Sequence, residues 1–177
     1  MKDSDAPATV ADLDGVLRRR DGLPAVRFDR HYATTPDDLW SAITDPERLA
    51  RWLMPVGGDL RQGGTYTIDY GDQGVAEGTI LECDPGRAFT VTWQIGGEPA
   101  GLVSAQIITG EHDPLLRLDH VQLPEDQAVG YAAGWHANLD RLAAELDENS
   151  SPDDVDFGDR WTELVPGYRA MGAIALA

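Results

Sequence analysis

Basic residues, cysteines and long apolar runs are scarce in this sequence. Its 177 residues include 31 acidic and only 14 basic ones, for a net charge of −17. Such a surface repels phosphate backbones and anionic membranes, so we expect no nucleic-acid partner. The single cysteine, Cys83, excludes an internal disulfide and indicates a reducing compartment. No segment approaches the ~20 apolar residues of a membrane span, and the first residues lack the apolar core of a signal peptide. We therefore expect a cytoplasmic protein without a membrane span.

Turns rich in glycine and proline divide residues 56–123 into short segments, several of which alternate between apolar and polar residues. Such alternation is typical of half-buried strands in an antiparallel sheet. An earlier strand begins near Val26, where the same alternation places Phe28, Arg30 and Tyr32 on one face. Two short helices are predicted after it, because Thr35-Pro36 and Asp45-Pro46 each place proline directly after an N-cap residue. Together the segments predict a sheet of about seven strands.

A long amphipathic helix is predicted between Pro124 and Pro152. At about 100° per residue its large apolar side chains form one narrow stripe, which comprises Tyr131, Trp135, Leu139, Leu142 and Leu146. Asn138 lies at the border of this stripe. Because the stripe needs an apolar surface to cover it, we expect the sheet to curl around the helix. A single helix does not fill a strongly curved sheet, so we expect a cavity between them that suits a small molecule.

The remaining residues are predicted to flank this domain. We assign residues 1–24 to an N-terminal extension, with one or two helical turns before Pro24, and residues 25–148 to the domain itself. Residues 149–177 begin as a charged linker and then place Trp161, Leu164 and Tyr168 among polar neighbours. These three side chains need an apolar surface, so the tail is expected to dock on its own domain or on a partner.

Several stretches of the chain resemble a known superfamily. They are "FDRHYATTPDDLWSAITDPERLARWL", "GTILECDPGRAFTVTW", "LRLDH" and "GWHANLDRLAAEL", in that order. The chain resembles the SRPBCC superfamily, which includes START domains and the birch-pollen allergen. Within it, the chain is most similar to the branch of the C-terminal domain of the activator of heat-shock protein 90 ATPase. The resemblance implies an α+β helix-grip fold with a strongly curved antiparallel sheet around a long C-terminal helix. It also implies a cavity, since members bind lipids, sterols, flavonoids or polyketide intermediates, and some catalyse cyclisation or hydrolysis.

Eight residues are candidates for lining the cavity, and each has a structural alternative. They are Arg30, Trp52, Tyr66, Trp93, His120, Tyr131, Trp135 and Asn138. Arg30 would alternatively form an ion pair with Glu77, Glu82 or Asp69 at the end of the sheet, because a buried unpaired charge is costly. His120 would be either a hydrogen-bonded wall residue or a ligand contact. The tryptophans would alternatively pack in the core, and Asn138 would be an exposed amide.

We expect no metal site and no cofactor. The four histidines, at positions 31, 112, 120 and 136, are not spaced as zinc ligands, and the sequence has no nucleophile elbow, dinucleotide fingerprint or paired-cysteine motif. The favoured function is therefore binding of a lipophilic small molecule by a monomer or homodimer, with no catalytic residue assigned. Two alternatives remain open. One is a cofactor-free enzyme of cyclase or hydrolase type, with His120 or a carboxylate as acid or base, and the other is a protein-interaction or chaperone-associated module.

Overall fold

The fold consists of one antiparallel sheet of eight strands and four α-helices that cover its concave face. The structure is a computed structural model that describes residues 7–177, so residues 1–6 of the predicted extension lie outside the described residues. The strands follow the spatial order β1-β2-β8-β7-β6-β5-β4-β3. Their bounds are β1 Gly15–Arg20, β2 Leu23–His31, β3 Val56–Gly58, β4 Thr65–Asp69, β5 Val75–Asp84, β6 Ala88–Ile95, β7 Gly101–Ile108 and β8 Leu115–Val121.

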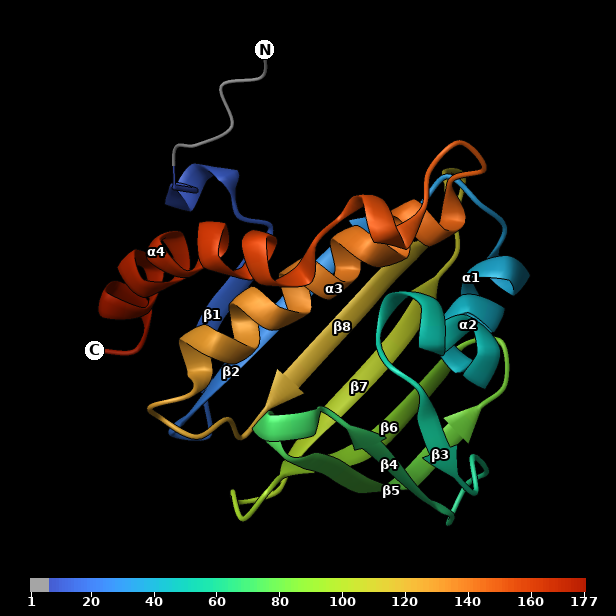
Figure 1. Cartoon of the computed structure of the whole chain (residues 1–177), viewed down its shortest axis with the longest axis horizontal. Helices are drawn as coiled ribbons and strands as arrows, with labels where there is room; N and C mark the ends of the chain where they lie inside the picture. Colours follow the sequence, from blue (N-terminus) through green and yellow to red (C-terminus); the bar gives the residue numbers. More distant parts are fainter. Residues whose placement is uncertain (1–6) are drawn as a thin grey trace.

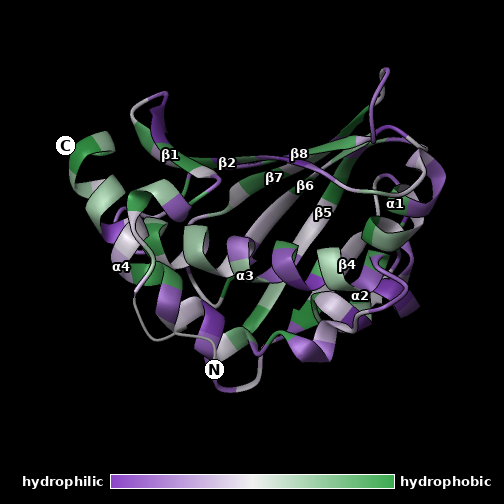
Figure 2. Cartoon of the chain, turned by 90° about the horizontal axis from the view of Figure 1, so that it is seen from above, coloured by the Kyte–Doolittle hydropathy of each residue, from purple (hydrophilic) through white to green (hydrophobic). Residues whose placement is uncertain are grey.

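The helices lie on one side of the sheet. They are α1 Pro36–Thr44, α2 Pro46–Trp52, α3 Ala128–Leu146 and α4 Phe157–Ala175, with short 3-10 turns η1 Val10–Asp12, η2 Gly71–Gln73 and η3 Pro152–Asp154. The long helix α3 crosses the sheet diagonally, with α4 near β1 and the pair α1–α2 toward the other end (Figure 1). Figure 2 shows from above how the sheet arches over α3. The α+β helix-grip fold predicted from the sequence is therefore confirmed.

Local sequence signals explain where the two short helices begin. The Thr35 hydroxyl accepts a hydrogen bond from the backbone N–H of Asp38, which is the third residue of α1. The Asp45 carboxylate accepts from the backbone N–H groups of Glu47 and Arg48 in α2. Each cap pairs N–H groups that have no partner within the helix. The prediction of two capped helices after the first long strand is therefore confirmed.

The strand faces follow the predicted alternation. Val26 and Phe28 of β2 are fully buried, and Leu116 and Leu118 of β8 lie beside them in the sheet and are also buried. In β5 the apolar residues occur on both faces, so alternation alone does not indicate its inner side. The reason is a register shift between Ile80 and Glu82, since an extra residue at a β-bulge moves the following side chains to the opposite face.

The sequence predicted one or two helical turns before Pro24, and one short turn, η1, is present, but residues 15–20 form the strand β1, which was not predicted. Residues 15–20 pair with residues 23–28 of β2 through a two-residue turn made by Asp21 and Gly22. Both turn residues have positive φ angles, 52° and 83°, as a type I′ hairpin requires. The Asp-Gly pair was the available signal for this hairpin. The three consecutive arginines beside it hid the signal, because they do not alternate with apolar residues.

The C-terminal helix α4 packs against α3 and β1. Its Leu164 and Tyr168 are fully buried, whereas Trp161 remains 36% exposed. Residues of the predicted tail therefore contribute to the same core as the sheet. Among the described residues, no helix is both long enough and apolar enough to cross a membrane.

Candidate functional site

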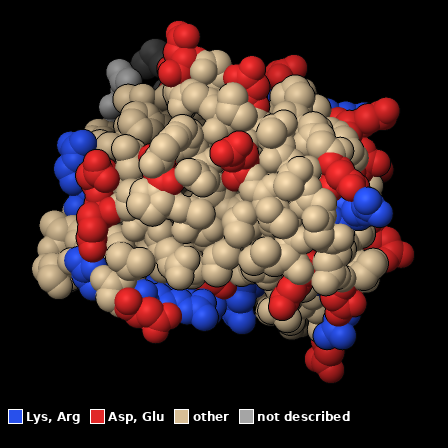
Figure 3. Space-filling view, turned by 90° about the horizontal axis from the view of Figure 1, so that it is seen from below, with Lys and Arg blue, Asp and Glu red and all other residues tan. Residues whose placement is uncertain are grey.

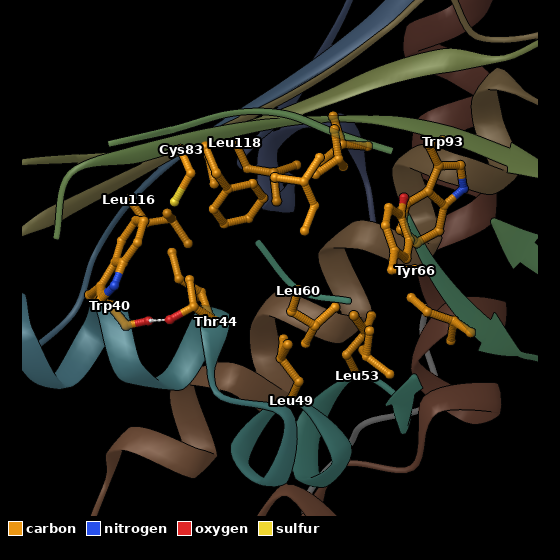
Figure 4. Close-up of a pocket in the computed structure, with 18 of the residues that line it drawn as sticks. Trp40, Thr44, Leu49, Leu53, Leu60, Tyr66, Cys83, Trp93, Leu116 and Leu118 are labelled. Carbon is orange, nitrogen blue, oxygen red and sulfur yellow. Dashed lines mark hydrogen bonds between the residues drawn. The ribbon is translucent and has the colours of Figure 1, made fainter. Parts of the chain in front are cut away.

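A cavity of about 380 Å³, here called the central cavity, lies between the sheet and the pair α1–α2. Its walls are mostly apolar and come from six strands and three helices. The lining includes Trp40, Ile43, Leu49 and Trp52 from the short helices, Tyr66, Ile68, Ile80, Phe89, Val91, Trp93, Val103, Ala105, Leu116 and Leu118 from the strands, and Trp135 from α3. Figure 4 shows these side chains converging on one space from the sheet and from the helices below it.

Most polar atoms on the cavity walls already have partners within the protein. The Thr44 hydroxyl donates to the carbonyl oxygen of Trp40, a bond also drawn in Figure 4, and the indole N–H of Trp52 donates to the carbonyl oxygen of Ala42. The Tyr66 hydroxyl donates to the carbonyl oxygen of Thr92 at 2.7 Å. A molecule in the cavity therefore meets few free hydrogen-bonding groups, and apolar contact is what the walls offer it.

No charged side chain of the described residues lines the central cavity. Its titratable groups are the thiol of Cys83 and the phenol of Tyr66, and burial raises the pKa of the Tyr66 phenol above its ordinary value. A phenol with a raised pKa is a poor acid near neutral pH. The walls thus provide no carboxylate or imidazole for proton transfer.

The cavity lies elsewhere than the sequence predicted. We expected it beneath the long helix, but α3 contributes only Trp135 to its lining, and α1 and α2 form the wall that faces the sheet. The stripe residues Leu139 and Leu142 of α3 are instead fully buried in the core. Close packing around these two residues leaves no space beneath the second half of α3. The short helices leave the space because they cover less of the sheet.

A second space, here called the aromatic groove, lies beside the central cavity. Its volume is about 600 Å³, and it is bounded by α3, η2, the β6–β7 turn and the start of α4. Six aromatic side chains line it, namely Tyr70, Trp93, Tyr131, Trp135, Phe157 and Trp161. Trp93 and Trp135 also line the central cavity, with ring centroids 5.5 Å apart, so these two side chains form a shared wall between the spaces.

Two predicted cavity residues lie in the aromatic groove rather than in the central cavity. The Tyr131 hydroxyl donates a hydrogen bond to a carboxylate oxygen of Glu98 at 2.7 Å, and burial is the main cause that raises the pKa of this phenol. Asn138 is only 9% exposed, so it is not the exposed amide of the structural alternative. Glu98, in the β6–β7 turn, escaped the sequence analysis because nothing in a glycine-rich turn indicates which helix it will face.

His120 is a buried wall histidine that lines neither space. It is 1% exposed, and its Nδ1 accepts a hydrogen bond from the indole N–H of Trp135 at 3.0 Å. Burial lowers its pKa to about 3, so the ring is neutral at ordinary pH. Its edges pack against Trp93 and Tyr131. The residue therefore orients the shared tryptophan wall.

Arg30 does not line the central cavity and lies instead in a network of charged groups near the middle of α3. Its guanidinium donates to Asp140 at 2.8 Å and to Asp14 at 3.0 Å, so the expected partners Glu77, Glu82 and Asp69 are wrong. The sheet order explains the difference, because β5 lies four strands from β2, or ~19 Å at the usual strand spacing. His136 joins the network by a 2.9 Å hydrogen bond to the Tyr168 hydroxyl.

The eight candidate residues thus lie in different parts of the structure. Trp52, Tyr66, Trp93 and Trp135 line the central cavity, Tyr131 and Asn138 line the aromatic groove, and His120 and Arg30 line neither. Of the residues that the short helices contribute, the sequence analysis named Trp52 and missed Trp40 and Leu49. Apolar residues in a short helix indicate an inward face, but nothing in the sequence indicates that this face borders a space. In the part of the chain that the structure describes, no group of three or more His, Cys, Asp or Glu side chains is arranged to hold a metal ion.

Comparisons with known proteins agree with this fold. The family model described as "Activator of Hsp90 ATPase homolog 1-like protein" matches residues 33–147. No curated protein matches the chain. The crystal structure of CalU16 from Micromonospora echinospora is 28% identical over 89% of this chain and 94% of its own, with a TM-score of 0.73.

Two more distant structures share the fold. DynU16, titled a putative protein in the dynemicin biosynthetic locus, is 22% identical over 79% of this chain and 49% of its own, with a TM-score of 0.65. The Aha1 dimer from Colwellia psychrerythraea is 17% identical over 70% of this chain and 96% of its own, with a TM-score of 0.62. At these identities the likeness concerns the arrangement of the elements.

Proposed function

This chain belongs to the family of Activator of Hsp90 ATPase homolog 1-like proteins, and on that premise we propose that it binds an apolar small molecule in the central cavity. The observation that carries the proposal is a space of about 380 Å³ whose described lining holds no charged side chain. Small-molecule sites usually have volumes of about 300–1,000 Å³ and mostly apolar walls. The cavity lies at the lower end of that range.

The chemistry of the walls specifies the ligand class. Because the hydroxyl and indole groups of Thr44, Trp52 and Tyr66 are already paired, a ligand rich in polar groups would lose hydrogen bonds to water without replacing them. A flat or branched hydrocarbon body would instead contact aromatic and aliphatic side chains on every side. The proposed ligand is therefore a lipophilic molecule with few polar groups.

Binding is favoured over acid–base catalysis. General acid–base catalysis needs a titratable group with a suitable pKa within hydrogen-bond reach of the reacting atoms. His120, the histidine proposed for that role, does not line the cavity, and its Nδ1 is occupied by the indole N–H of Trp135. The walls of the cavity support retention of a molecule and offer no group that would transform it by proton transfer.

The proposal can be tested by filling the cavity with a larger side chain. Ala105 of β7 lines the cavity, whereas its neighbour Gln106 points to the opposite, exposed face of the sheet. Ala105→Phe would place an aromatic ring inside the space, and Gln106→Phe would add the same ring outside it. Titration with N-phenylnaphthylamine, whose fluorescence rises in apolar surroundings, should show saturable binding to the native protein and to Gln106→Phe. Binding to Ala105→Phe should be at least about tenfold weaker, the equivalent of ~1.4 kcal/mol.

Native mass spectrometry of freshly purified protein complements this titration by detecting any ligand carried through purification. Equal probe affinity in both variants would place the probe elsewhere and contradict the proposal. So would the absence of saturable binding in the native protein together with a ligand-free mass. In that case the protein-interaction module becomes the better explanation of the fold.

A further inference from the structure

The aromatic groove has features that close packing alone does not explain, and the first is its charge. Glu98 is the only charged side chain among the described residues that line it. No arginine or lysine of residues 7–177 forms an ion pair with this carboxylate. One of its oxygens accepts the hydrogen bond of Tyr131, which fixes the carboxylate against the groove wall and leaves the other oxygen available. The groove therefore has a single, positioned negative charge.

The surrounding surface does not neutralise this charge. The turn that carries Glu98 and the short η2 lie at the lower edge of the molecule in Figure 1. The face seen from below is largely uncharged, with isolated acidic side chains, and Lys and Arg lie toward its margins (Figure 3). A positive group approaching Glu98 would thus meet attraction without competition from neighbouring basic side chains.

The second feature is a buried polar group without a partner, beside a free amide. The indole N–H of Trp93 is buried and has no hydrogen-bond partner among the described residues, although Trp93 is only 6% exposed. In Figure 4 the indole nitrogen points away from the central cavity. Asn138 also lines the groove, and no described residue hydrogen-bonds to its amide, which stays in contact with solvent. A buried donor without a partner is unfavourable, and a ligand with a hydrogen-bond acceptor would pair it.

The third feature is a pair of glycines in the wall that α3 contributes. Gly130 and Gly134 lie one turn apart and both line the groove. A Cβ atom at either position would meet its nearest neighbour, the ring of Trp161 or Phe157, at 4.0 Å, which is an ordinary contact. Packing therefore does not demand glycine here. Glycine destabilises a helix interior relative to alanine, so the pair maintains the width of the groove at the expense of stability.

From these three features we infer that the aromatic groove binds a small organic cation, a protonated or quaternary amine that also carries a hydrogen-bond acceptor. Aromatic side chains attract such cations through the negative faces of their rings. Glu98 supplies the counter-charge, and Trp93 and Asn138 supply the hydrogen bonds to the acceptor. The site is separate from the proposed ligand site in the central cavity, with which it shares only Leu53 and the two tryptophans.

Choline is a suitable probe, because it combines a quaternary ammonium with a hydroxyl, and 3,3-dimethylbutan-1-ol is its uncharged counterpart of the same shape. Chemical-shift titration of the indole N–H resonances should show saturable choline binding. The neutral alcohol should bind at least about tenfold more weakly, a difference within the range of cation–aromatic plus ion-pair contributions. Choline binding should also weaken with added salt.

Three variants locate the site. Glu98→Gln keeps the shape and should weaken choline binding at least about tenfold, whereas Glu111→Gln, which removes an exposed charge outside the groove, should not. Gly134→Ala should raise the melting temperature and weaken choline binding at the same time. Ala105→Phe, which fills the central cavity, should leave choline binding unchanged. Equal affinity for choline and the alcohol, undiminished binding by Glu98→Gln, or no saturable shift in the native protein would each overturn the inference. None of these results bears on ligand binding in the central cavity.

Discussion

The two halves of the concave face of the sheet differ in how completely they are filled. In the half formed by β1 and β2, here called the packed half, Phe28, Leu164 and Tyr168 are fully buried. In the half formed by β3 to β8, here called the hollow half, Phe89 of the cavity wall is only partly buried. One face of one sheet thus provides both a solid core and a binding space.

The length of the helices that cover each half explains the difference. The helices α3 and α4, which cover the packed half, have 19 residues each, or ~28 Å at 1.5 Å per residue. The helices over the hollow half, α1 and α2, have nine and seven residues, or ~13 and ~10 Å. Short helices cannot span the curved strands opposite them. The position of the cavity therefore follows from helix length as much as from the side chains that line it.

Removing α4 should have the largest effect on the packed half. Truncation after Asn149 would delete Leu164 and Tyr168, whose burial contributes ~1.5–3 kcal/mol each. Because typical domains are stable by only about 5–15 kcal/mol, we expect a large fall in the urea midpoint or an aggregating protein. Ile174→Ala is the control, since Ile174 is 82% exposed and should change stability by less than ~0.5 kcal/mol. An equally stable truncated protein would contradict the role assigned to α4.

A matched pair of substitutions compares the two halves directly. Phe28→Ala removes a fully buried ring in the packed half and should cost about 3–5 kcal/mol in the free energy of unfolding. Phe89→Ala removes the same ring from the wall of the central cavity, where one side of the ring lacks packing partners. Its cost should be less than about half as large. Urea denaturation of both variants measures the difference, and equal costs would mean that the hollow half is as well packed as the other.

Sequence reasoning succeeded where the signal is local. The caps at Thr35 and Asp45 fix the starts of two helices by contacts within three residues. The alternation around Phe28 fixes a strand face, because successive side chains point to opposite sides. Such features depend on neighbours in the chain, so the chain order reveals them.

The failures concern contacts between distant segments. Arg30 pairs with Asp140, 110 positions later in the chain, and no pattern around either residue indicates the other. Likewise, Tyr131 meets Glu98 only because the β6–β7 turn folds toward α3. The location of the cavity depended on how far each helix extends over the sheet. These outcomes are set by the packing of whole elements, which composition and periodicity do not record.

The smallest expected effect is a pH dependence that distinguishes the buried histidines of the two halves. Burial lowers the pKa of His120, in the hollow half, to about 3. Burial also lowers the pKa of His136 in the packed half, and there Arg30 lowers it further while Asp14 and Asp140 raise it. Histidine in the unfolded chain has a pKa of about 6.5. Below that pH the unfolded chain binds protons that the folded protein does not bind. Stability is therefore fully present above pH 6.5 and falls as the pH decreases toward 3, by at most ~1.4 kcal/mol per pH unit for each histidine.

Urea unfolding between pH 7.5 and 5 measures this slope before the carboxylates contribute strongly. His120→Gln retains an acceptor for the indole N–H of Trp135 but cannot titrate, so it should reduce the slope by up to one proton. The exposed His112→Gln controls for the loss of an imidazole. Because Asp14 and Asp140 oppose the shift of His136, whereas burial is the only cause acting on His120, His136→Gln should reduce the slope less than His120→Gln does. The opposite ranking would mean that the charged network of the packed half, and not burial in the hollow half, controls the acid sensitivity of the fold.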